Sequence, residues 1–133
     1  MQDEGSDALI VRTVRAPSTR IFLIRFLSFQ NGCFIVVAEG SNRIGSLYVS
    51  ITSSNKVNTA KVIPSKYDSM FINTISEKVS SMINGICLVC MYSAKQLHLD
   101  DMKAIMDEIM NLIRGEGSRN DDKKVDRVQT KRL

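Results

Sequence analysis

Hydrophobic and polar positions alternate through much of the first half of this chain, and some stretches are almost wholly apolar. Both patterns are typical of β-strands when Gly, Pro, Asn and Ser residues bound them. A strand-like pattern returns once more, later in the chain. The predicted strands are residues 9–15, 20–29, 33–38, 44–52, 57–63 and 86–92.

The apolar period changes to about 3.6 at Asp68, which predicts a helix that ends near Asn84-Gly85. A second helix is predicted at 99–114, with Gly115 just past its end. The element order is therefore βββββ-α-β-α. We expect an α+β fold, with an antiparallel sheet of about six strands and the two helices packed on one face.

Turn signals join the first three strands. Pro17 and Ser18 suit a turn between the first and second strands. Gln30-Asn31-Gly32 can supply the positive φ that a tight hairpin between the second and third strands needs. These strands are therefore predicted to be antiparallel neighbours.

Three segments of the predicted strands, 21–29, 33–38 and 86–92, have little or no polar face. Only two amphipathic helices follow from the pattern, and two helices can cover one face of a sheet of this size. A second sheet or a second chain must therefore cover the other face. This surplus of apolar strand favours a binding partner as the purpose of the protein.

Alternation divides the side chains of each strand between the two faces of the sheet. We expect the helices to cover one set of apolar side chains, namely Phe22, Ile24, Phe26, Leu47, Val49 and Ile51. The opposite face is then left for a partner. Its predicted contact residues are Leu23, Arg25, Leu27 and Tyr48.

Arg25 interrupts an otherwise apolar strand. One interpretation is a surface arginine whose aliphatic stem covers apolar area. The other is an interface anchor, because Arg is enriched at binding hot spots. The pattern alone leaves both interpretations open.

Composition changes this picture only through the distribution of charge. The 133 residues are 44% hydrophobic and carry a formal charge of +4. Residues 114–133 hold seven Lys/Arg and four Asp/Glu, a net of +3, which leaves +1 for residues 1–113. The body thus lacks the basic stripe typical of nucleic-acid-binding domains. We expect one domain at 9–114, a mobile acidic leader at 1–8 and a disordered charged tail at 115–133.

The acidic N-terminus lacks the apolar segment of a secretory signal, and the apolar runs are shorter than the roughly 18 residues of a membrane-spanning helix. We expect a cytoplasmic protein with no membrane partner, and the basic tail is compatible with import into the nucleus as well. Cys33, Cys87 and Cys90 lie inside apolar strands, where Cys behaves as a small hydrophobe. Reduced, buried thiols are therefore predicted.

Several patterns resemble reactive motifs but lack a required part. Cys87-Leu88-Val89-Cys90 lies within a strand, where positions i and i+3 point to opposite faces, so packing is favoured over redox or metal chemistry. The segment 40–46 lacks the Lys of a phosphate loop and precedes a strand, which indicates a turn. His98 has no nucleophile motif beside it, and the acidic pairs 100–101 and 107–108 suit helix-dipole compensation and a solvated helix face. We expect no enzymatic activity, cofactor or metal.

The residues also carry a resemblance to a known family. Leu23-Ile24-Arg25-Phe26, Gly45-Ser46-Leu47-Tyr48 and the strand-loop-helix region 85–113 resemble the small proteasome assembly chaperones of types 3 and 4. The similarity runs over residues 9–114, and the predicted order of elements is the family's order too. The Ile-Arg pair and the Gly-Ser-Leu-Tyr segment are more similar to type 4, whereas the turn at 43–47 fits type 3 equally well.

The resemblance implies a non-enzymatic chaperone that pairs with a sibling chain into a heterodimer. In the family, such a dimer binds α-type subunits of the core proteasome during formation of the α-ring and leaves before the mature particle forms. Two alternatives from other classes remain. One is a profilin-like or longin-like interaction scaffold in trafficking or signalling, and the other is a nucleic-acid-binding protein that uses its basic tail.

Overall fold

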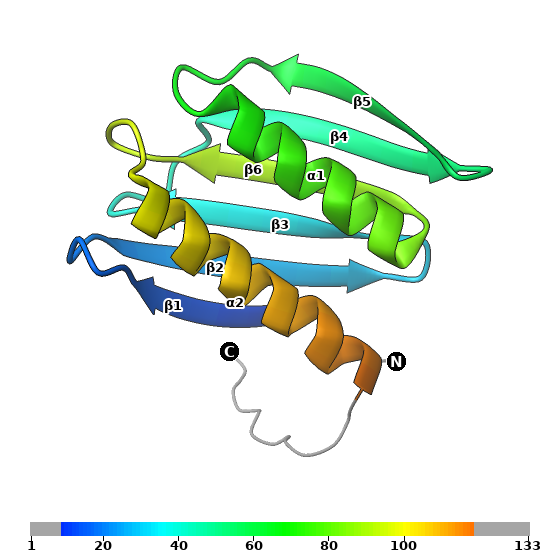
Figure 1. Ribbon diagram of the computed structural model, residues 1–133, viewed down its shortest axis with the longest axis horizontal. Helices are drawn as coiled ribbons and strands as arrows, with labels where there is room; N and C mark the ends of the chain where they lie inside the picture. Colours follow the sequence, from blue (N-terminus) through cyan, green and yellow to red (C-terminus); the bar gives the residue numbers. More distant parts are fainter. Residues whose placement is uncertain (1–8, 119–133) are drawn as a thin grey trace.

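A single sheet carries both helices on the same face (Figure 1). The computed structural model describes residues 9–118, and side chains within residues 9–115. Its elements are β1 (Leu9–Arg15), β2 (Ile21–Phe29), β3 (Gly32–Glu39), β4 (Ser46–Ser53), β5 (Lys56–Ile63), α1 (Ser69–Ile83), β6 (Ile86–Tyr92) and α2 (Leu99–Ser118). The predicted order of elements and the placement of two helices on one face are confirmed.

The strands pair in the order β1-β2-β3-β6-β4-β5. All pairs are antiparallel except β3 with β6, which is parallel, so the sheet is mixed and the prediction of an antiparallel sheet is wrong at this pair. β3 and β4 run in opposite directions. A strand inserted between them must therefore be parallel to one of them and antiparallel to the other.

β6 joins two parts of the sheet that do not otherwise pair with each other. β1, β2 and β3 form one antiparallel set, and β4 with β5 forms a hairpin. The chain leaves β5, crosses the sheet as α1 and returns as β6 between these two parts. α1 lies against β4, β5 and β6, whereas α2 lies against β1 and β2. Each helix therefore covers a different part of the same face.

The hairpin predicted after Phe29 is present, but the positive φ expected there is absent from that turn. Gly32 is needed for a different reason. A Cβ on Gly32 would overlap the Ile86 carbonyl oxygen, so glycine allows β6 to pass close to the start of β3. Positive φ occurs instead at Ser54 (52°) and Asn55 (65°), which form the two-residue turn between β4 and β5.

The core lies between the helices and the sheet. Phe22, Ile24 and Phe26 face the helices and are buried, as predicted. Their buried partners from the other elements include Ile35, Val37, Val89, Ile72, Ile75, Val79, Ile105, Ile109 and Ile113. The helix-facing side of the sheet is thus closed by the chain's own residues.

A network of buried charges fixes the start of α2 to the sheet. Asp101 is fully buried and accepts hydrogen bonds from Ser18 Oγ (2.5 Å), Arg20 Nη1 (3.1 Å) and the His98 backbone N–H (2.9 Å). Arg20 also donates to both carboxylate oxygens of Glu39, at 2.8 and 2.6 Å. Asp101 therefore lies in the core, and the prediction that it belongs to a dipole-compensating, solvated pair missed this role.

The network also shifts the ionisation of its carboxyl groups. Burial acts to raise the pKa of Asp101, but hydrogen bonds from Ser18 and His98 and the charge of Arg20 outweigh it and lower the pKa. Hydrogen bonds from Arg20 likewise hold the pKa of Glu39 below its ordinary value. Both carboxyl groups are therefore ionised at neutral pH.

Both helices begin where the sequence predicts, but only one of the two predicted C-terminal ends agrees with the structure. Asn84 ends α1 in a left-handed conformation (φ 52°), and the Gly85 N–H donates to the Ser80 carbonyl, as a C-terminal cap requires. α2 continues through Gly115 to Ser118, so the predicted helix end at 114 is wrong. The predicted leader at 1–8 and residues 119–133 of the predicted tail lie outside the described residues.

Candidate functional site: the open face of the sheet

The surface of the sheet opposite α1 and α2, called here the open face, is built by the side chains that alternate with the buried ones. No helix of the described residues covers it (Figure 1). Its apolar members include Leu9, Val11, Ile21, Leu23, Leu27, Phe29, Phe34, Val36, Leu47, Val49, Ile51, Ile86, Leu88 and Cys90.

Strand register places these side chains in continuous rows. One row crosses five strands in the order Leu9, Leu27, Phe34, Leu88 and Val49. Neighbouring strands lie about 4.8 Å apart, so this row alone spans roughly 19 Å. Monomeric soluble proteins rarely expose apolar patches larger than a few hundred Å². A continuous apolar surface of this width is typical of a surface that a partner covers.

The polarity of β4 is inverted relative to an ordinary surface strand. The side chains it turns toward the helices are hydroxyl-bearing, namely Ser46, Tyr48, Ser50 and Thr52. The side chains it turns outward are Leu47, Val49 and Ile51. Water-facing strands normally bury the apolar set and expose the polar one. β4 does the reverse, which indicates that the open face is meant to be covered.

Hydroxyl pairs between β4 and α1 explain how the polar set is satisfied. Ser50 Oγ donates to Ser76 Oγ at 2.8 Å, and Thr52 Oγ1 lies 2.8 Å from Ser80 Oγ. Because small hydroxyl side chains occupy both surfaces, each buried hydroxyl of these pairs finds a partner. Ser76 and Ser80 are four residues apart on one helix face, a spacing that could have revealed the contact in the sequence.

Tyr48 is consequently not on the open face. It is fully buried beneath α1, and its hydroxyl donates to Ser69 Oγ at 3.0 Å. The prediction that Tyr48 faces a partner is wrong, and so is the prediction that the helices cover Leu47, Val49 and Ile51. Both errors have one cause, because the rule that apolar residues face the core does not hold for β4.

Leu23, Arg25 and Leu27, the other three predicted contact residues, do lie together on the open face. All three are half-buried within the isolated chain. Arg25 stands between Val11 of β1 and Val36 of β3, and its Nη1 donates to Asn42 Oδ1 at 2.7 Å. The structure therefore brings these three residues together, and their contact with a partner stays a prediction.

The loop between β3 and β4 forms one rim of the open face. It supplies Asn42 to Arg25, and it places the Arg43 guanidinium carbon 5.4 Å from the centre of the Tyr92 ring. Gly40 adopts a positive φ of 72°, as suits a turn. The segment that resembled a phosphate loop is therefore a structural connection that carries two arginine contacts.

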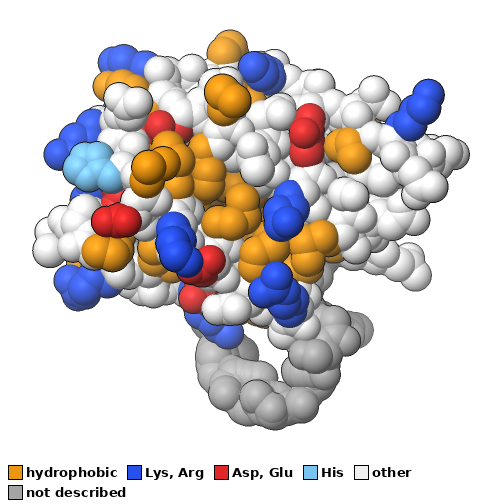
Figure 2. Space-filling view, viewed as in Figure 1, with side chains coloured by type: hydrophobic (Ala, Val, Ile, Leu, Met, Phe, Trp, Pro, Cys, Tyr) orange, Lys and Arg blue, Asp and Glu red, His pale blue; other side chains and the backbone are white. Residues whose placement is uncertain are grey.

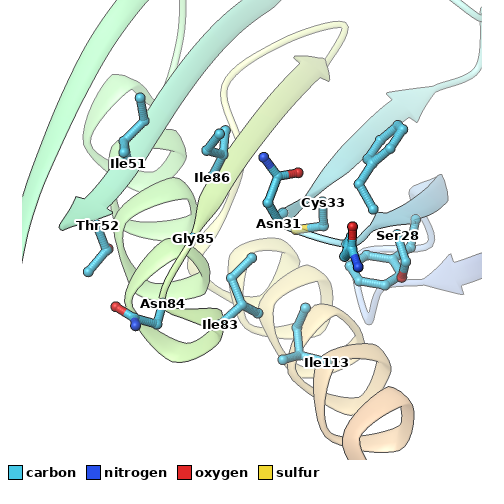
Figure 3. A pocket seen from close by; sticks show the side chains of 14 residues that line it. Ser28, Asn31, Cys33, Ile51, Thr52, Ile83, Asn84, Gly85, Ile86 and Ile113 are labelled. Carbon is cyan, nitrogen blue, oxygen red and sulfur yellow. The ribbon is translucent and has the colours of Figure 1, made fainter.

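A pocket of about 390 Å³ opens at the edge of the sheet where β2 turns into β3 (Figure 3). The open-face residues Ile51 and Ile86 contribute to its wall, together with Ile83 and Ile113 from the helices. The inner wall contains Cys33. The pocket thus connects the open face with the edge of the core.

The helix side has a different surface. Figure 2 shows lysine, arginine and acidic side chains scattered around an apolar seam on this side. Within residues 9–115, no group of three or more His, Cys, Asp or Glu side chains is placed to hold a metal ion. No helix in the described part of the chain is long and apolar enough to cross a membrane. Cys33, Cys87 and Cys90 are unpaired and buried, as predicted.

Comparisons with known proteins give similarity to solved structures only. No protein-family model and no curated protein matches this chain. A solved structure described as a novel chaperone complex for yeast 20S proteasome assembly has a TM-score of 0.49 to this chain and 16% sequence identity, over 80% of this chain and 88% of that one. A likeness of this degree assigns no function.

Proposed function

We propose that the chain is a non-enzymatic chaperone for assembly of the core proteasome, that it pairs with a sibling chain through the open face, and that this pair binds α-type subunits during α-ring formation. The inverted polarity of β4 supports the pairing most strongly. The resemblance of 23–26 and 45–48 to the small proteasome assembly chaperones supports the choice of assembly. Its place of action would be the cytoplasm and, with the basic tail, the nucleus.

The charge pattern of the open face favours a sibling chain over a second copy of this one. Arg25 is the charged side chain in the middle of the apolar rows, whereas Arg15 and Lys56 lie at the ends of the edge strands β1 and β5. The strands present no Asp or Glu on this face among the described residues. Self-pairing would therefore bury Arg25 against apolar side chains or another arginine. A buried charge without an opposite charge beside it is costly, and Asn42 offers Arg25 only a neutral oxygen. A sibling that offers a carboxylate opposite Arg25 would satisfy it and exclude the self-pair.

Sheet-on-sheet packing is the geometry that such a pair would use. Two sheets that pack face to face interdigitate the side chains of their inner faces in a layer about 10 Å thick. The half-buried Leu23, Leu27 and Val36 side chains have the character that this layer requires. The chaperone would then act by covering surfaces that otherwise associate wrongly, without any covalent chemistry.

Affinity capture from the protein's own cells tests this function. The tagged chain is captured at moderate salt, and the associated proteins are identified by mass spectrometry. Three versions are compared: the natural chain, Arg25→Glu with Leu27→Glu on the open face, and Lys103→Glu with Leu99→Glu on the helix side. Lys103 (75% exposed side chain) and Leu99 (81% exposed) give a control with the same change of charge and the same Leu→Glu replacement.

The natural chain and the helix-side control are both expected to recover one small sibling chain. The natural chain is also expected to recover α-type subunits, with few β-type subunits. The open-face variant should lose the sibling while its circular dichroism spectrum stays that of a folded chain. Recovery of trafficking or signalling proteins would instead support the scaffold alternative. Recovery of nucleic acid that salt releases would support the nucleic-acid-binding alternative.

A further inference from the structure

Two of the three cysteines face each other inside the sheet. Cys33 of β3 and Cys87 of β6 are direct partners in the parallel register, and their sulfur atoms are 3.9 Å apart. Both side chains point toward the helices and are buried. Cys90 lies on the open face of β6 opposite Val36, so no sulfur faces it within the described residues.

The backbone geometry permits a bond between Cys33 and Cys87. Neighbouring strands are about 4.8 Å apart, which lies within the range of roughly 4.4–6.8 Å that disulfides require between Cα atoms. The two sulfur atoms must approach from 3.9 Å to about 2.05 Å, and rotation of the two side chains about χ1 can supply this movement. No strand has to change its register.

The edge pocket gives a small oxidant a route to this pair. Cys33 forms part of the pocket wall, close to Asn31 of the β2–β3 turn (Figure 3). The hydrogen bond with Cys87 lowers the pKa of Cys33 against the opposing effect of burial. The same contact and burial raise the pKa of Cys87. Cys33 is thus the thiol that ionises first and lies nearer to solvent.

We propose that Cys33 and Cys87 are a modification site, at which a peroxide closes an intrachain disulfide between β3 and β6. The Cys33 thiolate attacks one oxygen of hydrogen peroxide, which breaks the O–O bond and gives a sulfenic acid and hydroxide. The Cys87 thiol then attacks the Cys33 sulfur, forms the S–S bond and releases water. In total, two thiols and one peroxide give one disulfide and two waters.

The bond would fix the strand that joins the two parts of the sheet. β6 links β1–β3 to the β4–β5 hairpin, and the residues that follow the two cysteines, Phe34 and Leu88, are paired neighbours on the open face. Oxidation would therefore lock the register at the centre of that face. It is expected to raise the thermal midpoint of unfolding, and a thiol reductant should reverse the rise.

Peptide mapping of the folded chain tests the site. Trypsin releases Cys33 in residues 26–43 and both other cysteines in residues 79–95, so the Cys90→Ser chain gives an unambiguous assignment. After mild hydrogen peroxide and alkylation, the two peptides are expected to be joined with the loss of two hydrogens. Cys33→Ser, which keeps Cys87 and Cys90, is the matched control and should give no intrachain link.

The natural chain provides a second measurement that does not depend on the folding of any variant. Fragmentation of its joined peptides should place the link at Cys87 and leave Cys90 open to alkylation. The folded chain is treated with a peroxide concentration that oxidises the chain in urea, and is then unfolded and alkylated. The site is refuted if Cys33 and Cys87 are still alkylated after this treatment. A link that includes Cys90 as often as Cys87 would refute it equally.

Discussion

The two faces of this sheet have similar apolar content, but only one of them is buried by the chain's own described elements. On the helix side, side chains such as Ile24, Ile35 and Val37 are fully buried by α1 and α2. On the open face, Leu27, Phe34 and Leu88 form a row of comparable character that the chain's own described elements leave half-buried. One face is therefore closed by folding, whereas the other has the composition of an interior without its cover.

The contrast is sharpest in β4, where polar side chains face the helices and apolar ones face outward. Folding alone would favour the reverse arrangement, because burial of apolar area is its main driving force. The cost of this arrangement is reduced by hydroxyl pairs with α1 on one side. On the other side, the proposed partner would recover it by removing Leu47, Val49 and Ile51 from water.

Removal of Arg20 should have the largest effect on the helix side. Arg20→Met leaves Asp101 buried and Glu39 without their cation, so the free energy of unfolding is expected to fall by about 3–5 kcal/mol. Urea denaturation followed by circular dichroism measures this loss. The exposed Arg12, which pairs loosely with Glu108 at 3.7 Å, supplies the control, because Arg12→Met should cost less than about 1 kcal/mol.

Two adjacent valines separate the faces within one strand. Val37 is fully buried under the helices, whereas Val36 is half-buried on the open face. Val37→Ala is expected to cost about 2 kcal/mol of unfolding free energy, and Val36→Ala about 0.5 kcal/mol or less. In binding to the sibling chain the order should reverse. Equal costs of folding would show that the open face is already covered in the isolated chain.

The hydroxyl contacts beneath α1 should have a smaller effect. Ser76→Ala removes one of the two hydroxyl partners of Ser50, the other being Thr59, from a fully buried position, at an expected cost of about 1 kcal/mol. Ser81→Ala, at an exposed position of the same helix, should leave unfolding almost unchanged. Thermal unfolding of both variants makes the comparison. No difference between them would mean that these hydroxyls contribute nothing to the packing of α1 on β4.

Acid acts on the network of Arg20, Asp101 and Glu39 by protonating its two carboxyl groups, so its effect on stability grows gradually as the pH falls. The pKa values of Asp101 and Glu39 are lowered in the folded chain. Their contribution to stability is therefore complete above the unfolded-state pKa values of about 4 and is lost as the pH falls through the lower folded-state values. Unfolding midpoints in urea at several acidic pH values measure the slope. Arg20→Met should flatten it, and an unchanged slope in that variant would contradict the assignment.

The sequence predicted those features that local patterns determine. Strand and helix positions follow from apolar periods. The side chains of β2 were divided correctly between the two faces because Arg25 marks one face as the less apolar one. The insertion of β6 between β3 and β4 was not predictable, since it depends on contacts between distant segments and no turn signal records it.

The candidate site was predicted in part, for a physical reason. Leu23, Arg25 and Leu27 share the open face because strand alternation is strict. Tyr48 was misplaced because its neighbours Leu47 and Val49 look like core residues when the chain is considered alone. β4 breaks the rule that a chain's apolar residues face its own core, and the proposed pairing through the open face accounts for this exception.

Side-chain footprinting with hydroxyl radicals tests the central claim most directly, by comparing the isolated chain with its complex with the sibling. The account predicts that Leu27, Phe34 and Leu88 are modified in the isolated chain and protected in the complex. Met70 (84% exposed) and Leu99 (81% exposed) on the helix side should be modified equally in both. Protection of Met70 and Leu99 without any change on the open face would contradict the account.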